Sequence, residues 1–372
     1  MREFIDGAEA IARGALHAGC DFFAGYPITP ATPILLHMIA ELPKVEGAAI
    51  QAEDEIAAIG FCIGAAMAGR RVMTATSGPG ISLYSENIGL AIMGEVPLVI
   101  VDVQRMGPST GGATTSAQGD VQFLRWGTSG GYPVIVLSPT NVRECYSLTR
   151  RAFDLAERFR VPVFLATDKE TVSARTTVDT TAYDAVPVRD RVRALDDAEF
   201  VPYRIAQPDD VPPMAPFAGP HVVRFTSSSH NERGYLTKNP ADVGRLNDHL
   251  AAKIDDHVDE IALVKTDIQP GAETLLISYG ITARAVIEAA AQARQHGRAV
   301  SVLTIYSVWP VPEAAIRQAL NGVKRVVVAE LNHGQYRREI ERLACGRDVI
   351  SVHRVDGQYI TPREIITQGG LA

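Results

Sequence analysis

The sequence predicts an α/β protein with a doubly wound parallel sheet, followed by a second and smaller α/β domain. Three observations lead to this prediction. Short apolar runs of strand length alternate with segments of helical spacing from Asp21 to Lys169, without a repeat or a hairpin signal. The run Pro97–Val103 is rich in β-branched residues, which is typical of a central parallel strand. The same alternation begins again at Thr274 and predicts the second domain.

The first domain is expected over residues 1–172. Thr32 is expected to cap a helix that Pro33 begins. In such a sheet, ligands bind at the loops that follow the carboxyl ends of the strands. The predicted strands cover residues 21–26, 48–51, 71–76, 97–103, 132–137 and 161–166, and the predicted helices cover residues 4–18, 51–69, 82–93 and 142–159.

Residues 173–262 are expected to form a linker and an extended segment. Seven prolines fall in one polar part of this segment, so Thr176–Pro220 is predicted to be an extended linker laid over a neighbour. A charged helix is expected over residues 239–264. The second domain is expected over residues 263–372, with strands at residues 275–279, 299–305 and 323–330 and helices at residues 282–296 and 336–344.

Composition and charge exclude several classes of function. The net charge of −7 and the pI of about 5.8 argue against nucleic acid as a partner, because no basic face dominates. The four cysteines lie far apart without CxxC spacing, so we expect no iron–sulfur cluster or other metal site on this chain. Charges break the most apolar region, Ile88–Val103, and the first twelve residues carry four charges. We therefore expect neither a membrane span nor a secretory signal, and a cytoplasmic protein.

The helix predicted over residues 51–69 has an unusual distribution of charge. Acidic residues open it, and none of its side chains after Glu55 is charged. Such a helix is expected to be buried all round. Burial favours the protonated form of a carboxyl, so Glu55 is a candidate to exchange a proton with a heterocyclic nitrogen. The alternative is that these acids serve only as partners of the helix dipole.

Loops after two predicted strands carry further candidate residues. The stiff, proline-rich turn Gly25–Pro33 exposes Thr29, which makes Thr29 a candidate ligand contact. The alternative is a plain turn in which Thr29 is an ordinary surface hydroxyl. The loop Ser77–Gly80 has glycines that let the backbone approach a flat ligand closely. It does not meet the dinucleotide pattern GxGxxG, because position 83 is leucine.

Arg105 follows the central strand and precedes the glycine-rich loop Gly107–Gly112. A guanidinium binds a carboxylate through two parallel hydrogen bonds, so Arg105 is a candidate carboxylate clamp. The alternative is a solvated arginine on a loop.

Several short motifs in one fixed order resemble the α subunit of the 2-oxoacid:ferredoxin oxidoreductases, and most closely their 2-oxoglutarate branch. These are thiamine-diphosphate enzymes. The resemblance covers both domains and implies a pyrimidine-binding domain followed by a transketolase C-terminal-like domain. The motifs are Gly25–Pro30, Glu53–Ala57, Thr76–Gly80, Gly94–Pro97, Val103–Gly111 and Glu330–Gln335.

The resemblance assigns Glu55 to the catalytic glutamate that bonds N1′ of the aminopyrimidine. In the thiamine-dependent enzymes that the chain resembles, this acid precedes a helix glycine by nine positions. Gly64 lies nine positions after Glu55, which supports Glu55 over Glu53. The acid favours the imino tautomer of the ring, whose 4′-nitrogen then takes the C2 proton of thiamine. The rest of the expected cofactor-binding set is Ser77, Gly78, Pro79, Gly80 and Asn87.

The resemblance also implies a substrate-binding set. Thr29 and Arg105 match contacts to the 1-carboxylate and the keto group of a 2-oxoacid, and Tyr26 and Thr110 complete the set. The loop Gly111–Gln118 lacks a lysine and a glutamate that related members often carry there. The identity of the 2-oxoacid therefore stays open.

One absent motif predicts a partner. Thiamine enzymes hold the diphosphate through Mg²⁺ on a Gly-Asp-Gly motif, and Gly119-Asp120-Val121 fails its third position. The chain is therefore expected to carry half of a thiamine site. A β subunit would supply Mg²⁺, the diphosphate site and a [4Fe-4S] cluster, in an obligate αβ pair and an expected (αβ)₂ assembly. The resemblance leaves open whether the assembly also contains a separate γ-like subunit or none.

The activity that the resemblance implies is the oxidative decarboxylation of 2-oxoglutarate to succinyl-CoA and CO₂, with coenzyme A as cosubstrate and ferredoxin as electron acceptor. Pyruvate or a branched-chain 2-oxoacid is the alternative substrate. Two other classes stay open from the residues themselves. They are a different thiamine-dependent enzyme, such as a carboligase or dehydrogenase subunit, and a scaffold without catalytic activity.

Overall fold

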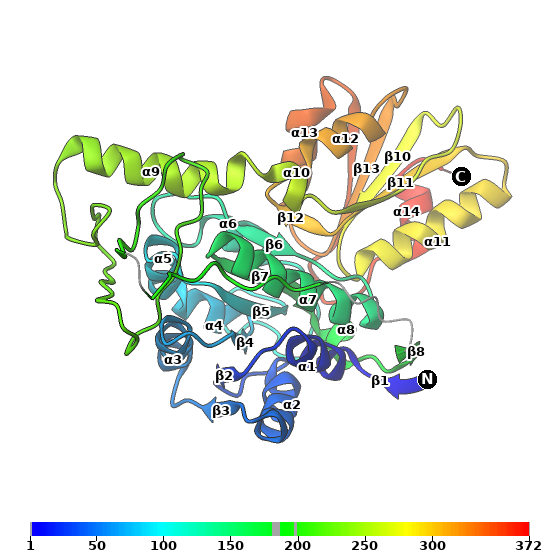
Figure 1. Cartoon of the computed structure of the whole chain (residues 1–372). Helices are drawn as coiled ribbons and strands as arrows, with labels where there is room; N and C mark the ends of the chain where they lie inside the picture. The colour runs from blue at the N-terminus through cyan, green and yellow to red at the C-terminus, as the bar shows by residue number, and fades with distance from the viewer. Residues whose placement is uncertain (1, 181–186, 197–198, 372) are drawn as a thin grey trace.

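The computed structural model describes residues 2–180, 187–196 and 199–371. Two sheets organise the chain, and they form a lower and an upper lobe in Figure 1. The lower sheet has the order β12-β6-β7-β5-β4-β2-β3, with all its strands parallel except β12. Its strands are β2 (Phe22–Gly25), β3 (Ala48–Gln51), β4 (Val72–Thr76), β5 (Leu98–Gln104), β6 (Ile135–Leu137), β7 (Pro162–Asp168) and β12 (Ser307–Trp309).

Helices cover both faces of this sheet, which confirms the doubly wound prediction. One face packs against α1 (Gly7–His17), α2 (Thr32–Glu41) and α7 (Val142–Phe159). The other face packs against α3 (Glu55–Met67), α4 (Gly78–Leu83), α5 (Ser85–Met93) and α6 (Val121–Trp126). The short α8 (Lys169–Ser173) and the 3₁₀ turn η1 (Leu42–Val45) complete the lobe.

The upper sheet has the order β14-β13-β10-β11-β9. Its α11 (Thr282–Gln295) and α14 (Pro362–Gln368) cover one face, and α12 (Glu313–Ala319) and α13 (Arg337–Ala344) cover the other. The second face shares one continuous core with the lower lobe, so the two domains pack as one body. The strands are β9 (Val264–Asp267), β10 (Thr274–Ser278), β11 (Val300–Ile305), β13 (Arg325–Glu330) and β14 (Asp348–His353).

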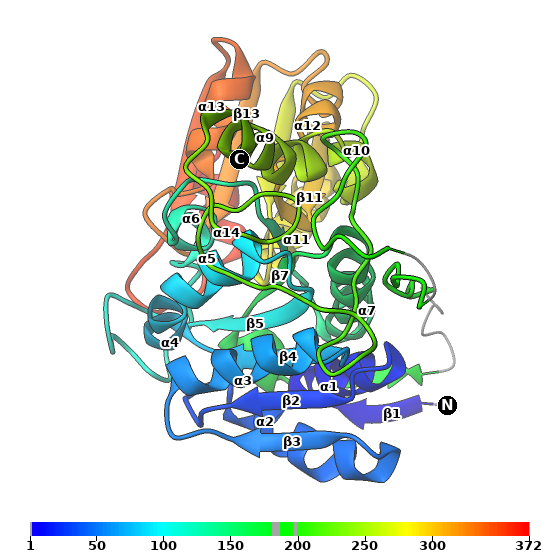
Figure 2. The ribbon, with the colours of Figure 1, turned by 60° about the vertical axis from the view of Figure 1, so that its left-hand side comes forward.

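Two segments outside the sheets cover the lower lobe. The strands β1 (Arg2–Ile5) and β8 (Thr176–Asp179) form an antiparallel pair, and the helices α9 (Pro240–Asp255) and α10 (Val258–Ile261) lead into the upper lobe. Figure 1 shows α9 above α5 and α6, and Figure 2 shows β2 beside β3 at the edge of the lower sheet. In the part of the chain that the structure describes, no helix is long and apolar enough to cross a bilayer.

Several predicted elements are wrong in detail. The helix expected over residues 239–264 is two helices followed by the start of β9. Thr32 is the first residue of α2, and Ala31 takes the cap position. The expected linker begins with β8, and its residues 181–186 and 197–198 lie outside the described residues. The short strands β1, β9, β12 and β14 were not predicted, because their pairing depends on partners far away in the chain.

Candidate functional site

The loops that follow β2 and β4 lie at the point where the sheet reverses its winding. From β2 the chain crosses to the edge strand β3, and from β4 it continues to β5 on the other side. The crevice at such a switch point is where open α/β sheets bind ligands. The segments with Thr29, Glu55, Ser77 and Arg105 follow four neighbouring strands. The topology therefore brings the separate sequence candidates to one edge.

Glu55 is the first residue of α3. Its neighbour Asp54 caps the helix, because Oδ1 of Asp54 accepts a hydrogen bond from the Ala57 amide at 2.8 Å. The Glu55 side chain lies against α4, and the residue is only 7% exposed. A Cβ atom on Gly80 would come within 2.9 Å of Glu55 Oε1. Glycine at position 80 is therefore what lets α4 pack this closely on the carboxyl group.

A buried hydroxyl group, that of Thr76, lies beside this carboxyl, and the buried Ser77 follows it in the chain. A Cβ atom on Gly80 would also fall 2.0 Å from Thr76 Oγ1, so Thr76 and Glu55 both contact the same glycine. Thr76 Oγ1 and Ser77 Oγ are buried without a hydrogen-bond partner among the described residues. Buried polar groups normally have a partner. Unsatisfied hydroxyls beside a buried acid fit a polar heterocyclic ligand at this place.

Arg105 contacts the backbone of Thr29 and not its side chain. Arg105 Nη1 donates a hydrogen bond to the carbonyl oxygen of Thr29, and the arginine is 5% exposed. Its Nε has no hydrogen-bond partner within the described ranges. The side chains of Thr29 and Tyr26 are both exposed. Part of the guanidinium therefore remains available to a carboxylate beside an open entrance.

Two predicted site residues stand apart from this cluster. Thr110 is exposed on the loop between Met106 and Thr115, which is closed by a hydrogen bond from the Met106 amide to the Thr115 carbonyl at 2.8 Å. Asn87 lies partly exposed in α5. The structure thus gathers Glu55, Ser77–Gly80, Arg105 and the backbone of Thr29, and leaves Thr110 and Asn87 at the margin.

A pair of aspartates beside Arg105 was not predicted. Asp102, at the end of β5, is fully buried, and its carboxyl group hydrogen-bonds to that of Asp120. Asp120 Oδ2 lies 3.5 Å from where a Cβ atom of Gly78 would be, so the pair borders the Ser77–Gly80 loop. The sequence signal that pointed here is an acid inside a β-branched run, which is costly to bury without a partner.

The two aspartates perturb each other. Burial, and then the charge of Asp120, raise the pKa of Asp102 well above its usual range. Burial raises the pKa of Asp120 to about 6, although the positive charge of Arg105 opposes this change. Two adjacent buried carboxyls cannot both ionise cheaply, so the pair holds one proton at neutral pH.

The second domain fixes the segment that carries Asp120. The Gln118 side chain is buried and binds the carbonyl of Tyr279, the hydroxyl of Thr282 and the amide of Leu331. Asn332 Nδ2 donates to the Gln118 carbonyl at 2.7 Å, and Gln335 Nε2 donates to the Gly119 carbonyl at 2.7 Å. The motif Glu330–Gln335 thus holds the chain just before Asp120 in place across the domain boundary.

The expectation that α3 is buried all round is wrong for one face. Ile56 is 51% exposed and Phe61 is 42% exposed, and Leu83 of the neighbouring α4 is 48% exposed. On the same helix, a Cβ atom added to Gly60 or Gly64 would have no neighbouring atom within 4 Å. We call these five residues the α3 outer face. Their composition is typical of a core, yet nothing in the described chain packs on them.

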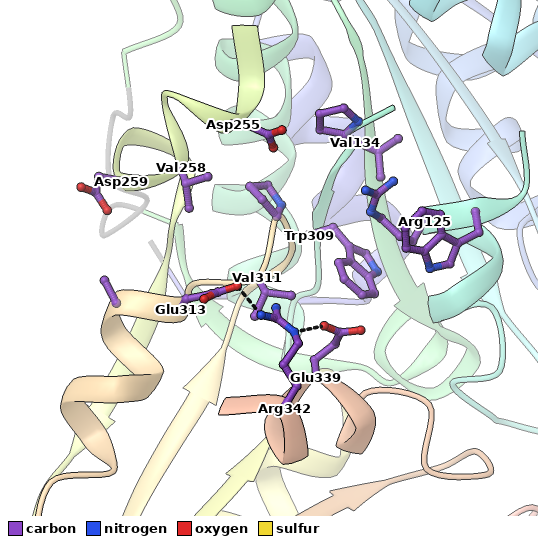
Figure 3. Close-up of a pocket in the computed structure, with 14 residues that line it drawn as sticks. Arg125, Val134, Asp255, Val258, Asp259, Trp309, Val311, Glu313, Glu339 and Arg342 are labelled. Carbon is purple, nitrogen blue, oxygen red and sulfur yellow. Dashed lines mark hydrogen bonds and ion pairs between the residues drawn. The ribbon is translucent and has the colours of Figure 1, made fainter. Parts of the chain in front are cut away.

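A hollow of about 490 Å³ lies elsewhere, where α6 and the lower lobe meet the upper lobe. Arg342 bridges Glu313 and Glu339 there at 2.6 and 2.9 Å, as Figure 3 shows. Arg125 packs over the Trp126 ring at 3.9 Å and donates to backbone carbonyls. None of the predicted site residues lines this hollow, and both of its arginines already have partners.

The fold and the site define an α/β protein with a candidate ligand site at the switch point of its parallel sheet. Residues 13–246 match the family described as pyruvate flavodoxin/ferredoxin oxidoreductase, thiamine diphosphate-binding, and residues 272–365 match pyruvate:ferredoxin oxidoreductase core domain II. The chain therefore belongs to the pyruvate flavodoxin/ferredoxin oxidoreductase family. The resemblance drawn from the motifs is confirmed.

Relatives within the family point to one branch. The chain is 43% identical to the 2-oxoglutarate synthase subunit KorA of Methanothermobacter thermautotrophicus, over 98% of this chain and 96% of that one. It is 32% identical to the ketoisovalerate oxidoreductase subunit VorB of the same organism, over 98% and 96% of the two chains. The solved 2-oxoglutarate:ferredoxin oxidoreductase of Magnetococcus marinus, with 2-oxoglutarate, coenzyme A and succinyl-CoA bound, superposes with a TM-score of 0.94 at 31% identity. That match covers 98% of this chain and 64% of the solved chain.

Proposed function

We propose that this chain is the α subunit of a 2-oxoglutarate:ferredoxin oxidoreductase. With its partner it converts 2-oxoglutarate and coenzyme A to succinyl-CoA and CO₂ and passes electrons to ferredoxin. One observation carries the proposal. Glu55 is buried at the start of α3 against Gly80, which also contacts the unsatisfied hydroxyl of Thr76, in a chain that is 43% identical to a 2-oxoglutarate synthase subunit over nearly its whole length.

The residues at the switch point suit the aminopyrimidine half of thiamine diphosphate. When bound, the cofactor supplies a nucleophilic carbon and an electron sink for decarboxylation. Glu55 would hold the ring through N1′, and its burial keeps the proton in that contact away from water. The hydroxyl groups of Thr76 and Ser77 would gain the hydrogen bonds that they lack within the described chain. Gly80 keeps α4 packed against Glu55 and Thr76, and Gly78, Pro79 and Asn87 would border the ring.

Arg105 would orient the substrate. Its guanidinium is nearly buried and has an unpaired Nε in the described part of the chain, so it can bind the 1-carboxylate of a 2-oxoacid. Holding a reactant in a productive orientation can lower the barrier by several kcal/mol. Thr29, Tyr26 and Thr110 lie on the exposed rim of the same edge, where they would contact the rest of the substrate.

The α3 outer face supports a proposed docking site for the partner. Apolar side chains stay exposed next to the proposed pyrimidine site, and exposed apolar patches of this kind mark interfaces. A β subunit docked here would complete the cofactor site with Mg²⁺ and the diphosphate-binding motif, and would carry the [4Fe-4S] cluster. The expected assembly is (αβ)₂ in the cytoplasm, with or without a separate γ-like subunit.

Reconstitution tests the proposal. The αβ complex is assayed with coenzyme A and ferredoxin against 2-oxoglutarate, pyruvate and branched-chain 2-oxoacids. We expect a preference for 2-oxoglutarate and no turnover by this chain alone. Glu55→Gln should lower the rate by about 10²–10⁴-fold and leave assembly intact, whereas the exposed Glu53→Gln should have little effect.

Three results would contradict it. Turnover by the isolated chain would show that the partner is not obligate. A preference for another 2-oxoacid would change the branch, a possibility that the altered loop Gly111–Gln118 makes worth measuring. Full activity of Glu55→Gln would place the cofactor elsewhere or leave the chain as a scaffold.

A further inference from the structure

The Asp102–Asp120 pair forms a buried acidic site beside Arg105. Apart from their mutual contact, both oxygens of Asp102 and Oδ2 of Asp120 are buried without a hydrogen-bond partner among the described residues. The backbone amide of Asp120 donates to Gln104 Oε1 at 3.1 Å, which holds the start of α6 against the end of β5. A buried carboxyl with free oxygens is costly unless it serves another group.

The charges around this pair are few. Arg105 and Asp102 are the charged groups that act on Asp120, and Asp120 is the charged group that acts on Asp102. The neighbouring Gly78 and Gln104 are uncharged. The hydrogen bond of Arg105 to Thr29 goes to a neutral carbonyl. Asp120 is therefore a described acid on which the charge of Arg105 acts, and the pair with one proton can balance the charge of the guanidinium.

A substrate carboxylate on Arg105 changes this balance. Arg105, the singly charged pair and the new carboxylate would leave one excess negative charge in a buried site, where charge is expensive. The excess disappears if the pair takes up one proton. When the carboxylate later departs as neutral CO₂, Arg105 again lacks a counter-charge, and loss of the proton restores it.

We propose that the Asp102–Asp120 pair is an exchangeable counter-ion of Arg105, which yields to the substrate carboxylate by taking one proton from solvent and returns that proton when CO₂ leaves. No bond of the chain other than this O–H bond is made or broken in the exchange. The inference rests on the proposed function, because it takes the 2-oxoacid carboxylate as the ligand of Arg105. It explains why a clamp can orient a group that must depart without holding it too tightly.

Two features of the structure support the exchange. The pKa of Asp120, about 6, lies close enough to neutrality for both protonation states to be reached. The Gln118, Asn332 and Gln335 contacts fix the backbone next to Asp120 from the second domain. The aspartate therefore stays at its place while its charge changes.

The test measures protons rather than turnover. Calorimetric binding of 2-oxoglutarate to the αβ complex without thiamine diphosphate, in buffers of different ionisation enthalpy at neutral pH, gives the number of protons taken up. We expect uptake approaching one proton in the unaltered complex and in the control Asp248→Asn. Uptake should be lost in Asp120→Asn, whereas Asp102→Asn retains the ionisable Asp120 and should keep it. Asp120→Asn should bind 2-oxoglutarate about tenfold more tightly, because the competing charge is gone.

Kinetics with the full complex separate positioning from simple structural support. Asp120→Asn should lower both KM and kcat, the latter by roughly tenfold, because Arg105 keeps its carboxylate too well. A merely structural role would lower kcat without tighter binding and would therefore overturn the proposal. If Asp120→Asn fails to fold, as judged by circular dichroism, the double variant Asp102→Asn, Asp120→Asn carries the test, because it also lacks the exchanging carboxyl and should take up no proton.

The outcomes distinguish this inference from the proposed function. Turnover of 2-oxoglutarate together with binding that takes up no proton overturns the counter-ion exchange and leaves the proposed function standing. Unchanged proton uptake in Asp120→Asn does the same. Failure of the unaltered complex to bind or convert any 2-oxoacid overturns both proposals.

Discussion

Replacing Lys253 by methionine should destabilise the chain strongly. Lys253 lies in α9 and is fully buried, and its Nζ donates to Glu95 Oε2 at 2.7 Å. The same oxygen lies 3.0 Å from His249 Nε2, and Arg160 Nε donates to the Glu95 carbonyl at 3.2 Å. These contacts attach α9 to the turn between α5 and β5. The variant keeps a side chain of similar length and removes its charge.

The expected loss is about 3–5 kcal/mol in the free energy of unfolding, because one buried charge is left without its main partner. The double variant Glu95→Gln, Lys253→Met removes both charges. It should recover most of the loss, since a neutral pair of similar volume costs little to bury. The difference between the two variants isolates the charge from the packing.

Urea denaturation followed by circular dichroism measures both variants. The control is Lys44→Met, which breaks the exposed ion pair with Glu41 and should cost about 0–1 kcal/mol. A loss below about 1 kcal/mol for Lys253→Met, or a double variant as unstable as the single one, would refute the reasoning. It would mean that water or relaxation solvates Glu95 after the change.

The pH dependence of the same cluster has a definite sign. Burial raises the pKa of Glu95, but the combined effect of Lys253, His249 and Arg160 outweighs it and leaves the pKa well below the usual value of 4.5. A carboxyl with a lowered folded-state pKa stabilises the protein above its unfolded-state pKa. The stability difference between the unaltered chain and Glu95→Gln should therefore shrink as the pH falls below about 4.5.

Three further outcomes are expected. Gly80→Ala should lower the activity of the αβ complex at least about tenfold without loss of secondary structure, because a Cβ atom displaces Thr76 and Glu55; unchanged kinetics would contradict the site. Gln118→Ala should cost about 2–3 kcal/mol in urea denaturation, since it leaves buried groups of the second domain unpaired; a change within about 0.5 kcal/mol would contradict it. Phe61→Glu should prevent assembly with the β subunit in size-exclusion chromatography and leave the isolated chain folded; normal assembly would place the interface elsewhere.

The fold class followed from local pattern. The run Leu98–Gln104 is buried along its whole length, and a β-branched run flanked by helical segments has few other solutions in a parallel sheet. The family followed from short motifs in a fixed order. Glu55 and Arg105 were found as candidates because Glu55 lies at the start of a predicted helix and Arg105 follows the end of a predicted strand. Their roles toward cofactor and substrate stay predictions until they are measured.

The tertiary structure alone decided what pairs over long separations. Strand β12 joins the lower sheet beside β6, although β6 ends at Leu137 and β12 begins only at Ser307, and no local pattern specifies such a partner. In the sequence, Asp102 and Asp120 are two unrelated features, an acid in a strand and a failed Gly-Asp-Gly motif. Only their contact shows that they share a site with Arg105.

The α3 outer face marks the same boundary between sequence and structure. Composition determined that this helix is apolar on every side, and it therefore predicted burial. The folded chain covers one side and leaves Ile56 and Phe61 open. The apolar pattern of a helix shows how much of its surface must be buried. Which element buries that surface depends on the tertiary arrangement and on any second chain.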